Sequence, residues 1–186
     1  MFFLIKNIND YSEDELKNFF YEIPIYKQEK IKKYKSEKEI KMSIIGEIIL
    51  KELLKKNYNL NYNRLIFKTN KNGKPFIANS NVFFNISHSK EYIIVAISNN
   101  PIGVDIEKKR KISNNMIKYI TNESEKNYIL SSKDFLNTFF KLYVLKEAYI
   151  KMLGLNINCT TSILYSEIHP YLNLESSTHK SCYFLP

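Results

Sequence analysis

The sequence has few of the features that mark secreted, membrane or metal-cluster proteins. Its 186 residues include two cysteines, Cys159 and Cys182, which form no CxxC pair and lie far apart. They therefore provide neither a disulfide framework nor a common metal-ligand spacing, and we expect both thiols to be reduced and structural. The first residues, Met1 to Ile8, are a short apolar run without a basic leader or a small-residue cleavage site. These absences favour a cytoplasmic protein without a membrane role.

The sequence also lacks the signatures of common nucleic-acid-binding domains, although it is strongly basic. Its formal net charge of +9 predicts attraction to polyanions such as nucleic acid, phosphorylated cofactors and acidic proteins. Basic residues among many tyrosines and phenylalanines would suit a nucleic-acid-binding module, yet no zinc-finger, RNA-recognition or KH motif is present. Charge alone does not choose among these partners, so this alternative stays open.

The N-terminal part of the chain predicts a strand followed by helices. With 44% hydrophobic and 14% aromatic residues, the chain can bury a substantial core in one domain or two small ones. Phe2 to Ile5 suits a short strand, and a capping box of Ser12 and Glu15 predicts a helix through Phe20. A second capping box, Ser36 with Glu39, precedes a stripe at helical spacing: Ile40, Ile44, Ile45, Ile48, Ile49 and Leu53.

The middle and later parts predict strands and then helices. An Asn-Gly turn within residues 70–73 lies between two extended segments, Arg64 to Lys68 and Pro75 to Ala78. Three more strands are expected over Val82 to Ile86, Tyr92 to Ser98 and Ile102 to Glu107, one or two helices over Asn114 to Leu130, and a long helix over Leu136 to Leu153 that ends at Gly154. This order favours an α+β fold over a regular alternating α/β sheet.

Two carboxylates share one face of the expected strand that ends at Glu107. Strand alternation places Asp105 and Glu107 on one side, while Val104 and Ile106 turn to the other. Adjacent oxygen ligands suit a hard cation such as Mg²⁺. The alternative is a solvated strand face on which the carboxylates pair with the basic residues Lys108 to Arg110.

A third carboxylate and a polar strand end are further candidates. Glu147 has mostly apolar neighbours three and four residues away on its helix, so it calls for a partner. An exposed pair with Lys151 would supply one, at about 0.3 to 0.5 kcal/mol. The segment Phe84 to Ser89 ends a strand with hydrogen-bonding side chains, among them His88, beside the basic Lys90, which makes phosphate binding plausible.

Four segments taken together resemble the 4′-phosphopantetheinyl transferases, and the closer match is to the larger, surfactin-synthetase-activating type. That family carries a GVDxE strand and a WxxKExxxK helix about forty residues apart. Here Asp105 and Glu147 are 42 residues apart in the same order. Each motif alone is weak, but the ordered set is specific: residues 73–75 (GKP), 84–88 (FNISH), 103–107 (GVDIE) and 146–151 (KEAYIK).

The resemblance covers Lys27 to Gly154 and implies a fold. Family members consist of two similar α+β halves that form a pseudo-dimer within one chain, each with a small, mostly antiparallel sheet packed on a long helix and with the site between them. This places the halves at residues 1–100 and 101–186, in a protein that we expect to be a monomer. The resemblance fades after Gly154, so this is either a compact member or one whose second sheet is shortened.

The resemblance also implies a reaction and its residues. A serine of an acidic acyl or peptidyl carrier protein attacks the β-phosphate of coenzyme A, accepts its 4′-phosphopantetheine arm and releases 3′,5′-ADP. Mg²⁺ would be held by Asp105, Glu107 and Glu147, while Lys151 would neutralise the pyrophosphate. The base for the serine is left open among Glu147, a metal-bound water, Glu123 and Glu125. The expected contacts to the nucleotide and phosphates of coenzyme A are Lys27, Lys30, Ser43, Lys74, Ser87, His88 and Lys151.

The chain departs from the family pattern at two positions. Tyr143 stands where the helix usually carries tryptophan, which keeps an aromatic ring. Met42 stands where an arginine precedes the small hydroxyl residue, here Ser43, and Lys41 lies beside it. We therefore expect weaker or differently shared nucleotide affinity, and a degenerate member that binds coenzyme A or a carrier without turnover is a further alternative.

Overall fold

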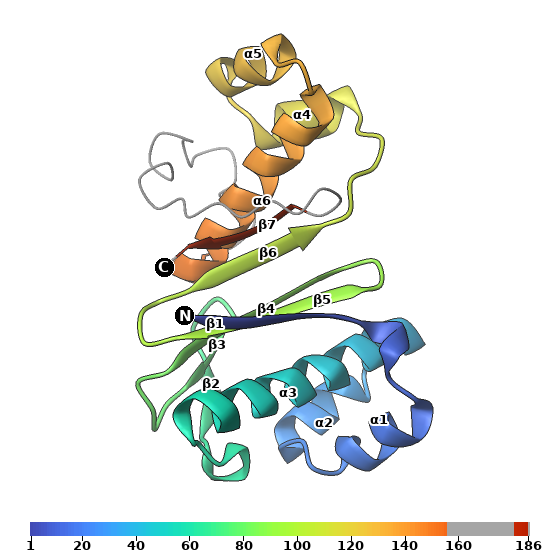
Figure 1. The fold of residues 1–186 in the computed structure, drawn as a ribbon, viewed down its shortest axis with the longest axis vertical. Coiled ribbons are helices and arrows are strands. Elements are labelled where there is room, and N and C mark those ends of the chain that lie inside the picture. The colour runs from blue at the N-terminus through green and yellow to red at the C-terminus, as the bar shows by residue number, and fades with distance from the viewer. Residues whose placement is uncertain (156–180, 186) are drawn as a thin grey trace.

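The computed structural model describes residues 1–155 and 181–185, the latter as backbone only. The expected α+β fold is confirmed (Figure 1). The strands are β1 (Phe2–Asn7), β2 (Phe67–Thr69), β3 (Pro75–Ile77), β4 (Phe83–Ser89), β5 (Tyr92–Ser98), β6 (Gly103–Glu107) and β7 (Ser181–Leu185). The α-helices are α1 (Glu13–Phe20), α2 (Ile25–Ile31), α3 (Glu37–Tyr58), α4 (Asn114–Ile120), α5 (Glu123–Ser131) and α6 (Phe135–Leu153), and two 3-10 turns cover Ile8–Asp10 and Tyr62–Arg64.

A three-stranded antiparallel sheet of order β1-β5-β4 occupies the middle of the molecule. The central strand β5 pairs Ala96 with Phe3 on one side and with Asn85 on the other. Its residues alternate between two apolar layers: Ile93, Val95 and Ile97 belong to one buried cluster, and Ile94 and Ala96 to another. This strand is therefore apolar throughout because both of its faces are covered.

Helix α3 forms the layer on one face of this sheet. Its apolar stripe, which includes Ile45, Ile49 and Leu53, packs into the same cluster as Val95 and Phe84. Gly46 brings the helix close to the sheet, since a Cβ there would lie 3.2 Å from Cδ1 of Ile93. Helices α1 and α2 flank α3 on the side away from β6, as Figure 1 shows.

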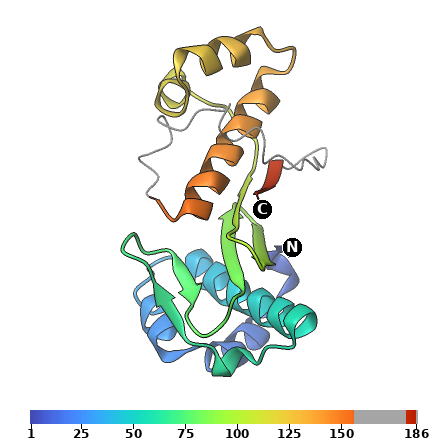
Figure 2. The same ribbon diagram turned by 90° about the vertical axis from the view of Figure 1, so that its left-hand side faces the viewer.

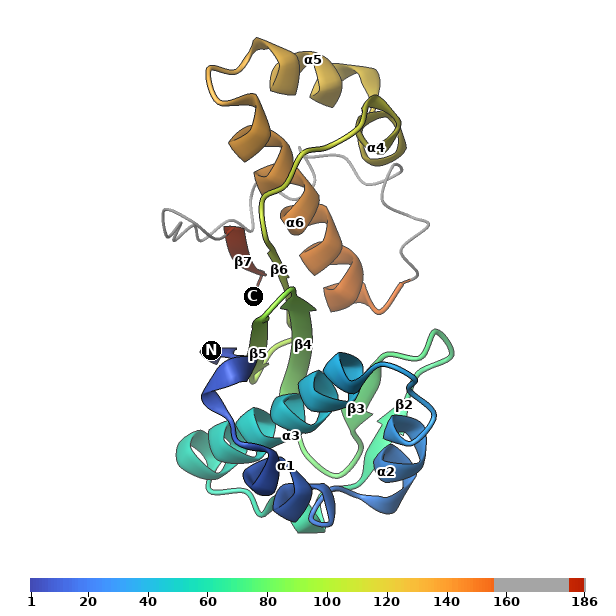
Figure 3. The same cartoon turned by 90° about the vertical axis from the view of Figure 1, so that its right-hand side faces the viewer.

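On the other face of the sheet lie β6 and then α6. Val104 and Ile106 are buried with Ile94 and Ala96, so the odd-numbered carboxylates turn the opposite way, as alternation predicts. Gly103 lets β6 touch α6, because a Cβ there would lie only 1.9 Å from the carbonyl oxygen of Ala148. Figures 2 and 3, seen from opposite sides, both show α6 alongside β6, with α4 and α5 at the end of the molecule away from α3.

The β2–β3 hairpin joins the first part of the chain to the end of α6. Gly154 ends α6 in the left-handed conformation, with φ of 66°. Its carbonyl accepts hydrogen bonds from the side chains of Asn70 (3.3 Å) and Asn72 (2.8 Å). These bonds satisfy a helix-terminal carbonyl that has no partner within the helix.

Several local predictions are confirmed and three are wrong. The Ser12–Glu15 capping box forms. Ser36 is the N-cap of α3, but the Ser36 side chain makes no capping hydrogen bond, so the prediction of a second capping box is wrong. Of the expected segment 64–68, only Phe67 and Lys68 lie in a strand, β2, and Arg64 belongs to the 3-10 turn. Strand β4 continues three residues past Ile86, so residues 87–89 lie within it and not beyond it.

Some helical features were not fixed by the sequence, and some expectations stay predictions. Helix α2 was not expected from its basic sequence, and the helical segment 114–130 is two helices. The described part of the chain contains no helix that is long and apolar enough to cross a bilayer. Cys159 lies outside the described residues. The pseudo-dimer, the division at residue 100 and the shortened second half remain predictions.

Candidate active site

A ladder of side chains joins β4 to β6, although the two strands belong to different sheets. Asn85 accepts a hydrogen bond from the backbone N–H of Val104 at 2.9 Å. Two residues on, Ser87 donates to Asp105 at 2.6 Å, and two further on Ser89 donates to Glu107 at 2.9 Å. The period of two on each strand aligns three polar residues of β4 with the carboxylate face of β6. This alternation is visible in the sequence of β4, but the sequence alone does not identify β6 as the partner of this face.

Asp105 and Lys151 form the centre of the site. The Lys151 Nζ lies 2.6 Å from Oδ1 of Asp105 and 2.8 Å from Oγ of Ser87. Asp105 is only 4% exposed, so this contact supplies a positive charge to a carboxylate that water barely reaches. The pair of Glu147 with Lys151, which was the alternative considered for Glu147, is not formed, because the amine of Lys151 binds Asp105 on the strand.

Two carboxylate oxygens at this centre have no hydrogen-bond partner among the described residues. They are Oδ2 of Asp105 and Oε1 of Glu147, and both are buried. Burial raises the pKa of Asp105 above its ordinary value, against the opposing effect of Lys151. Burial and then the charge of Asp105 raise the pKa of Glu147 to about 7. Two acids from β6 and α6 are thus held close together in a place that disfavours their charged forms.

Glu107 lies at the more open end of this face. It accepts hydrogen bonds from Ser89 and from Arg110, each at 2.9 Å. The pairing with Arg110 was the alternative considered for this strand face, and it holds for Glu107 only, because Asp105 binds Lys151 and Lys108 binds Glu91.

The three carboxylates fit a divalent cation in their chemistry. The charges of Asp105 and Glu107 both raise the pKa of Glu147, which shows that the three carboxylates lie near one another. Within the described residues, no three acidic, histidine or cysteine groups already stand as they would around an ion. The ammonium of Lys151 binds one oxygen of Asp105, and the guanidinium of Arg110 binds one oxygen of Glu107. The partnerless oxygens of Asp105 and Glu147 are the ones available for a hard cation.

Tyr143 lies one helical turn before Glu147. Its ring stacks on Phe139 with centroids 6.2 Å apart. Burial, and after it the charge of Glu147, raises the pKa of the Tyr143 hydroxyl, so the group stays protonated near neutral pH. At the position of the family tryptophan, an aromatic ring therefore lies beside the carboxylates.

A hollow of about 300 Å³ lies between α2, α3, the β2–β3 hairpin and β4. It brings together four of the residues expected to contact a nucleotide: Lys27, Lys30, Ser43 and His88. The backbone of Gly73 and Pro75 lines it too, so two of the three residues of the GKP motif face it. Partial burial of the ring and the charge of Lys151 lower the pKa of His88, which favours its neutral form.

The other three expected contacts to coenzyme A are placed elsewhere, and Lys151 lies at Asp105 as described above. Ser87 faces the carboxylates, since neighbouring residues of a strand point to opposite faces and His88 faces the hollow. The Lys74 Nζ donates to the carbonyls of Ile102 (3.2 Å) and Met152 (2.9 Å), and burial lowers its pKa to about 8. In this structure Lys74 therefore joins the hairpin to β6 and α6.

Glu47 is a part of the hollow that the sequence did not reveal. It is 6% exposed, forms an ion pair with Lys27 and accepts a hydrogen bond from the hydroxyl of Tyr62. The Lys27 amine also lies 4.7 Å from the centre of the Phe67 ring. The helical spacing of Ser43 and Glu47 on one face of α3 was the available signal.

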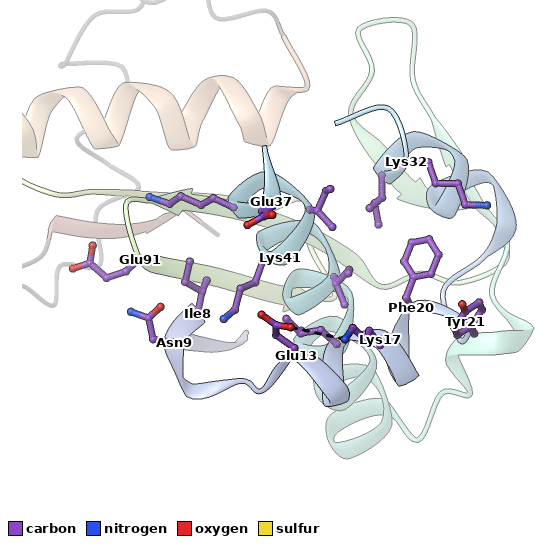
Figure 4. Close-up of a pocket in the computed structure, with 15 residues that line it drawn as sticks. Ile8, Asn9, Glu13, Lys17, Phe20, Tyr21, Lys32, Glu37, Lys41 and Glu91 are labelled. Carbon is purple, nitrogen blue, oxygen red and sulfur yellow. Dashed lines mark ion pairs between the residues drawn. The ribbon is translucent and has the colours of Figure 1, made fainter. Parts of the chain in front are cut away.

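Lys41 does not replace the missing arginine beside Ser43. Met42 lines the hollow of about 300 Å³, whereas Lys41 lines a separate, larger one of about 850 Å³. Figure 4 shows Lys41 in this second hollow, with the Glu13–Lys17 ion pair nearby. One residue along a helix turns the side chain by roughly 100°, which sends the two residues to different faces.

Sequence models of one family match nearly the whole chain. The model described as 4′-phosphopantetheinyl transferase, N-terminal, matches residues 10–100, and the 4′-phosphopantetheinyl transferase superfamily model matches residues 101–182. The chain belongs to the 4′-phosphopantetheinyl transferase superfamily. The suspected family is thereby confirmed, and the carboxylates and the hollow of about 300 Å³ lie within these two matches.

Named relatives agree with this family. The 4′-phosphopantetheinyl transferase gsp of Aneurinibacillus migulanus is 34% identical over 130 residues, which are 69% of this chain and 54% of the relative. The 4′-phosphopantetheinyl transferase Sfp of Bacillus subtilis is 28% identical over 178 residues, which are 92% of this chain and 80% of the relative. A human relative, L-aminoadipate-semialdehyde dehydrogenase-phosphopantetheinyl transferase, is 26% identical over 166 residues, 80% of this chain and 53% of its own.

Two of the candidates for a base on the carrier serine are engaged elsewhere. Glu125 is buried and pairs with Lys146 at 2.6 Å, while the amine of Lys146 also donates to the carbonyl of Ile120 at 2.9 Å. The side chain of Glu123 is 81% exposed and pairs with Lys126. Of the three glutamates considered, Glu147 is the one beside Asp105.

Proposed function

We propose that this protein transfers the 4′-phosphopantetheine arm of coenzyme A to a serine of an apo acyl or peptidyl carrier protein and releases 3′,5′-ADP. Family membership supports the type of reaction. The observation that carries it to particular residues is the pair of buried, partnerless oxygens on Asp105 and Glu147. Two buried carboxylates held close together are stabilised most by a cation between them, because it offsets their repulsion and their loss of hydration.

The metal site in this proposal consists of Asp105, Glu107 and Glu147. Mg²⁺, when bound there, supplies positive charge beside the transferring phosphate and the leaving group. Lys151 already lies at Asp105, so its ammonium would meet the pyrophosphate beside the carboxylates and balance negative charge there. Ser87 holds both Asp105 and Lys151, which keeps the carboxylate and the amine in one geometry.

Glu147 is also our candidate for the group that accepts the proton of the carrier serine. Without a bound cation, burial raises the pKa of Glu147 to about 7, so its affinity for a proton is higher than that of an ordinary carboxylate. A bound Mg²⁺ would lower this pKa, so the choice of Glu147 rests mainly on its place beside Asp105. The engagement of Glu125 with Lys146 and the outward position of Glu123 support this choice. Tyr143 would shield the reacting groups from water.

Coenzyme A would bind with its nucleotide in the hollow of α2, α3 and the hairpin. Lys27 and Lys30 would contact its phosphates, and Ser43 and His88 the nucleotide. Lys74 would hold the hairpin that lines this hollow in place, through its hydrogen bonds to the carbonyls of Ile102 and Met152. The carrier partner would be acidic, since the net charge of +9 attracts it over long range, and the enzyme would act as a monomer.

Product analysis tests this proposal. With coenzyme A, Mg²⁺ and an apo carrier, we expect 3′,5′-ADP to form in equal amount to the modified carrier. A carrier whose modified serine is replaced by alanine is the control and should give no 3′,5′-ADP. Tight binding of coenzyme A without product would favour the degenerate alternative.

A further inference from the structure

The nucleotide hollow contains a carboxylate where an anion is expected to bind. Glu47 lines the hollow together with Lys27 and Lys30, and its carboxylate already pairs with Lys27. The pair is well shielded, since the side chains of Lys27 and Glu47 are 13% and 8% exposed. A buried pair of opposite charges presents little net charge to a phosphate beside it.

Glu47 is held in place from the opposite side. The hydroxyl of Tyr62, which is 2% exposed, donates to the second carboxylate oxygen of Glu47. Lys27 is held as well, because its amine lies over the rings of Phe67 and Phe84. These contacts fix the ion pair within the wall of the hollow, so neither partner turns freely toward a ligand.

Lys30 differs from Lys27. It lines the same hollow, its side chain is exposed, and within the described residues it makes no ion pair with a carboxylate. Its full charge is therefore available to an anion. At Met42, the side chain that lines the hollow carries no charge at all.

We propose that Glu47 is a specificity-determining residue that weakens recognition of the 3′-phosphate of coenzyme A by neutralising Lys27, and leaves Lys30 as the main cation for that phosphate. This inference rests on the proposed function. It means that the wild-type protein distinguishes only weakly between coenzyme A and the same molecule without its 3′-phosphate. The charge of Glu47, and not its size, produces the effect.

Direct binding of 3′,5′-ADP and 5′-AMP tests the proposal without a carrier or turnover, because the two ligands differ only in the 3′-phosphate. Calorimetry in EDTA gives the ratio of the two dissociation constants. Glu47→Gln keeps one acceptor oxygen for Lys27, offers its amide N–H to the oxygen of the Tyr62 hydroxyl and removes the charge, so we expect it to raise the preference for 3′,5′-ADP by about three- to tenfold. The added change Lys27→Met in the Glu47→Gln protein should remove this gain.

Two variants that keep Glu47 serve as controls. Tyr62→Phe disturbs the same wall but leaves the carboxylate charge, and should leave the preference near the wild-type ratio. In the otherwise wild-type protein, Lys30→Met should remove most of the remaining preference for 3′,5′-ADP, which provides a test that does not require the Glu47 variant to fold.

Three results would overturn the proposal. An unchanged or lower preference in folded Glu47→Gln is one, and an unchanged preference in Lys30→Met is another. If the wild-type protein binds neither nucleotide nor coenzyme A, the proposed function fails together with the inference. Binding of both nucleotides without a selective effect of Glu47 contradicts the inference alone.

Discussion

The amine of Lys151 on α6 lies 2.6 Å from Oδ1 of Asp105 on β6, and Ser87 of β4 donates to the same oxygen. Three elements that are distant in sequence therefore meet at one carboxylate. The remaining oxygen of Asp105 and one of Glu147 have no partner among the described residues. The account of the active site depends on this arrangement.

Loss of Lys151 should reduce transfer strongly. Lys151→Met removes the positive charge beside Asp105 and the proposed pyrophosphate contact, so we expect kcat/KM to fall by about 10² to 10³. Lys56→Met, which removes an exposed charge from the end of α3, is the matched control and should change kcat/KM less than about threefold. Steady-state kinetics with one carrier measures both, and equal effects of the two changes would contradict the role of Lys151.

The metal-free protein should respond to pH through Glu147. Burial raises its pKa from 4.5 to about 7, so the fold favours the protonated form. The stabilisation from that proton is complete below about pH 4.5 and is lost as the pH rises through 7. In EDTA, Glu147→Gln should therefore raise Tm by about 2 to 5 °C at pH 8 and change it little at pH 5. The same Tm difference at both pH values would show that Glu147 is not perturbed.

The buried pair of Lys146 and Glu125 should contribute to the folded state and not to chemistry directly. Lys146→Met leaves the Glu125 carboxylate without its cation, and we expect a loss of about 3 to 5 kcal/mol in the free energy of unfolding. The Lys126–Glu123 pair on α5, the helix that carries Glu125, is the more exposed matched control. Lys126→Met should lower the free energy of unfolding by at most about 1 kcal/mol. Urea unfolding of both variants measures this difference. Equal losses in the two variants would show that the buried pair does not stabilise the fold more than the exposed pair does.

Gly103 should tolerate no side chain. Gly103→Ala places a methyl group against the backbone of Ala148 and Met152 in α6, so strand and helix must separate. We expect a destabilisation of about 1 to 3 kcal/mol together with reduced transfer, because Asp105 and Glu147 move apart. In the control, Gly46→Ala, the nearest neighbours of the new methyl group are side-chain atoms, Cδ1 of Ile93 at 3.2 Å and Cγ2 of Ile86 at 3.5 Å, and the helix gains propensity. A Gly103→Ala protein as stable as Gly46→Ala would refute the close approach.

Periodicity allowed much of the fold to be predicted from the sequence. The alternation in Gly103–Glu107 placed Asp105 and Glu107 on one face, and the helical stripe of α3 predicted its buried side. Helix α2 was missed because its basic composition hides a short helix that follows Pro24. The Ser36 capping box failed because sequence spacing gives the possible partners but not the side-chain rotamer.

The partners of the site residues were harder to predict. Lys151 has both Glu147 and Asp105 within reach, and only the packing of β6 on α6 decides for Asp105. Ser87 and His88 are neighbours in sequence but serve different sites, because the strand continues past Ile86. Glu47 and Lys74 acquire their partners from segments that are distant in the chain, and no local pattern encodes such contacts.

The most direct test of the account is the intact mass of an apo carrier protein after incubation with this enzyme and coenzyme A. A small panel of fatty-acid, polyketide and peptide-synthetase carriers provides the substrates. We predict that at least one carrier gains the mass of one phosphopantetheine group with Mg²⁺ and not with EDTA. Asp105→Ala should abolish the gain, while Asp14→Ala, which changes an exposed acid on α1, should preserve it. Unchanged mass of every carrier with the wild-type protein and Mg²⁺, or full modification by Asp105→Ala, would contradict the account.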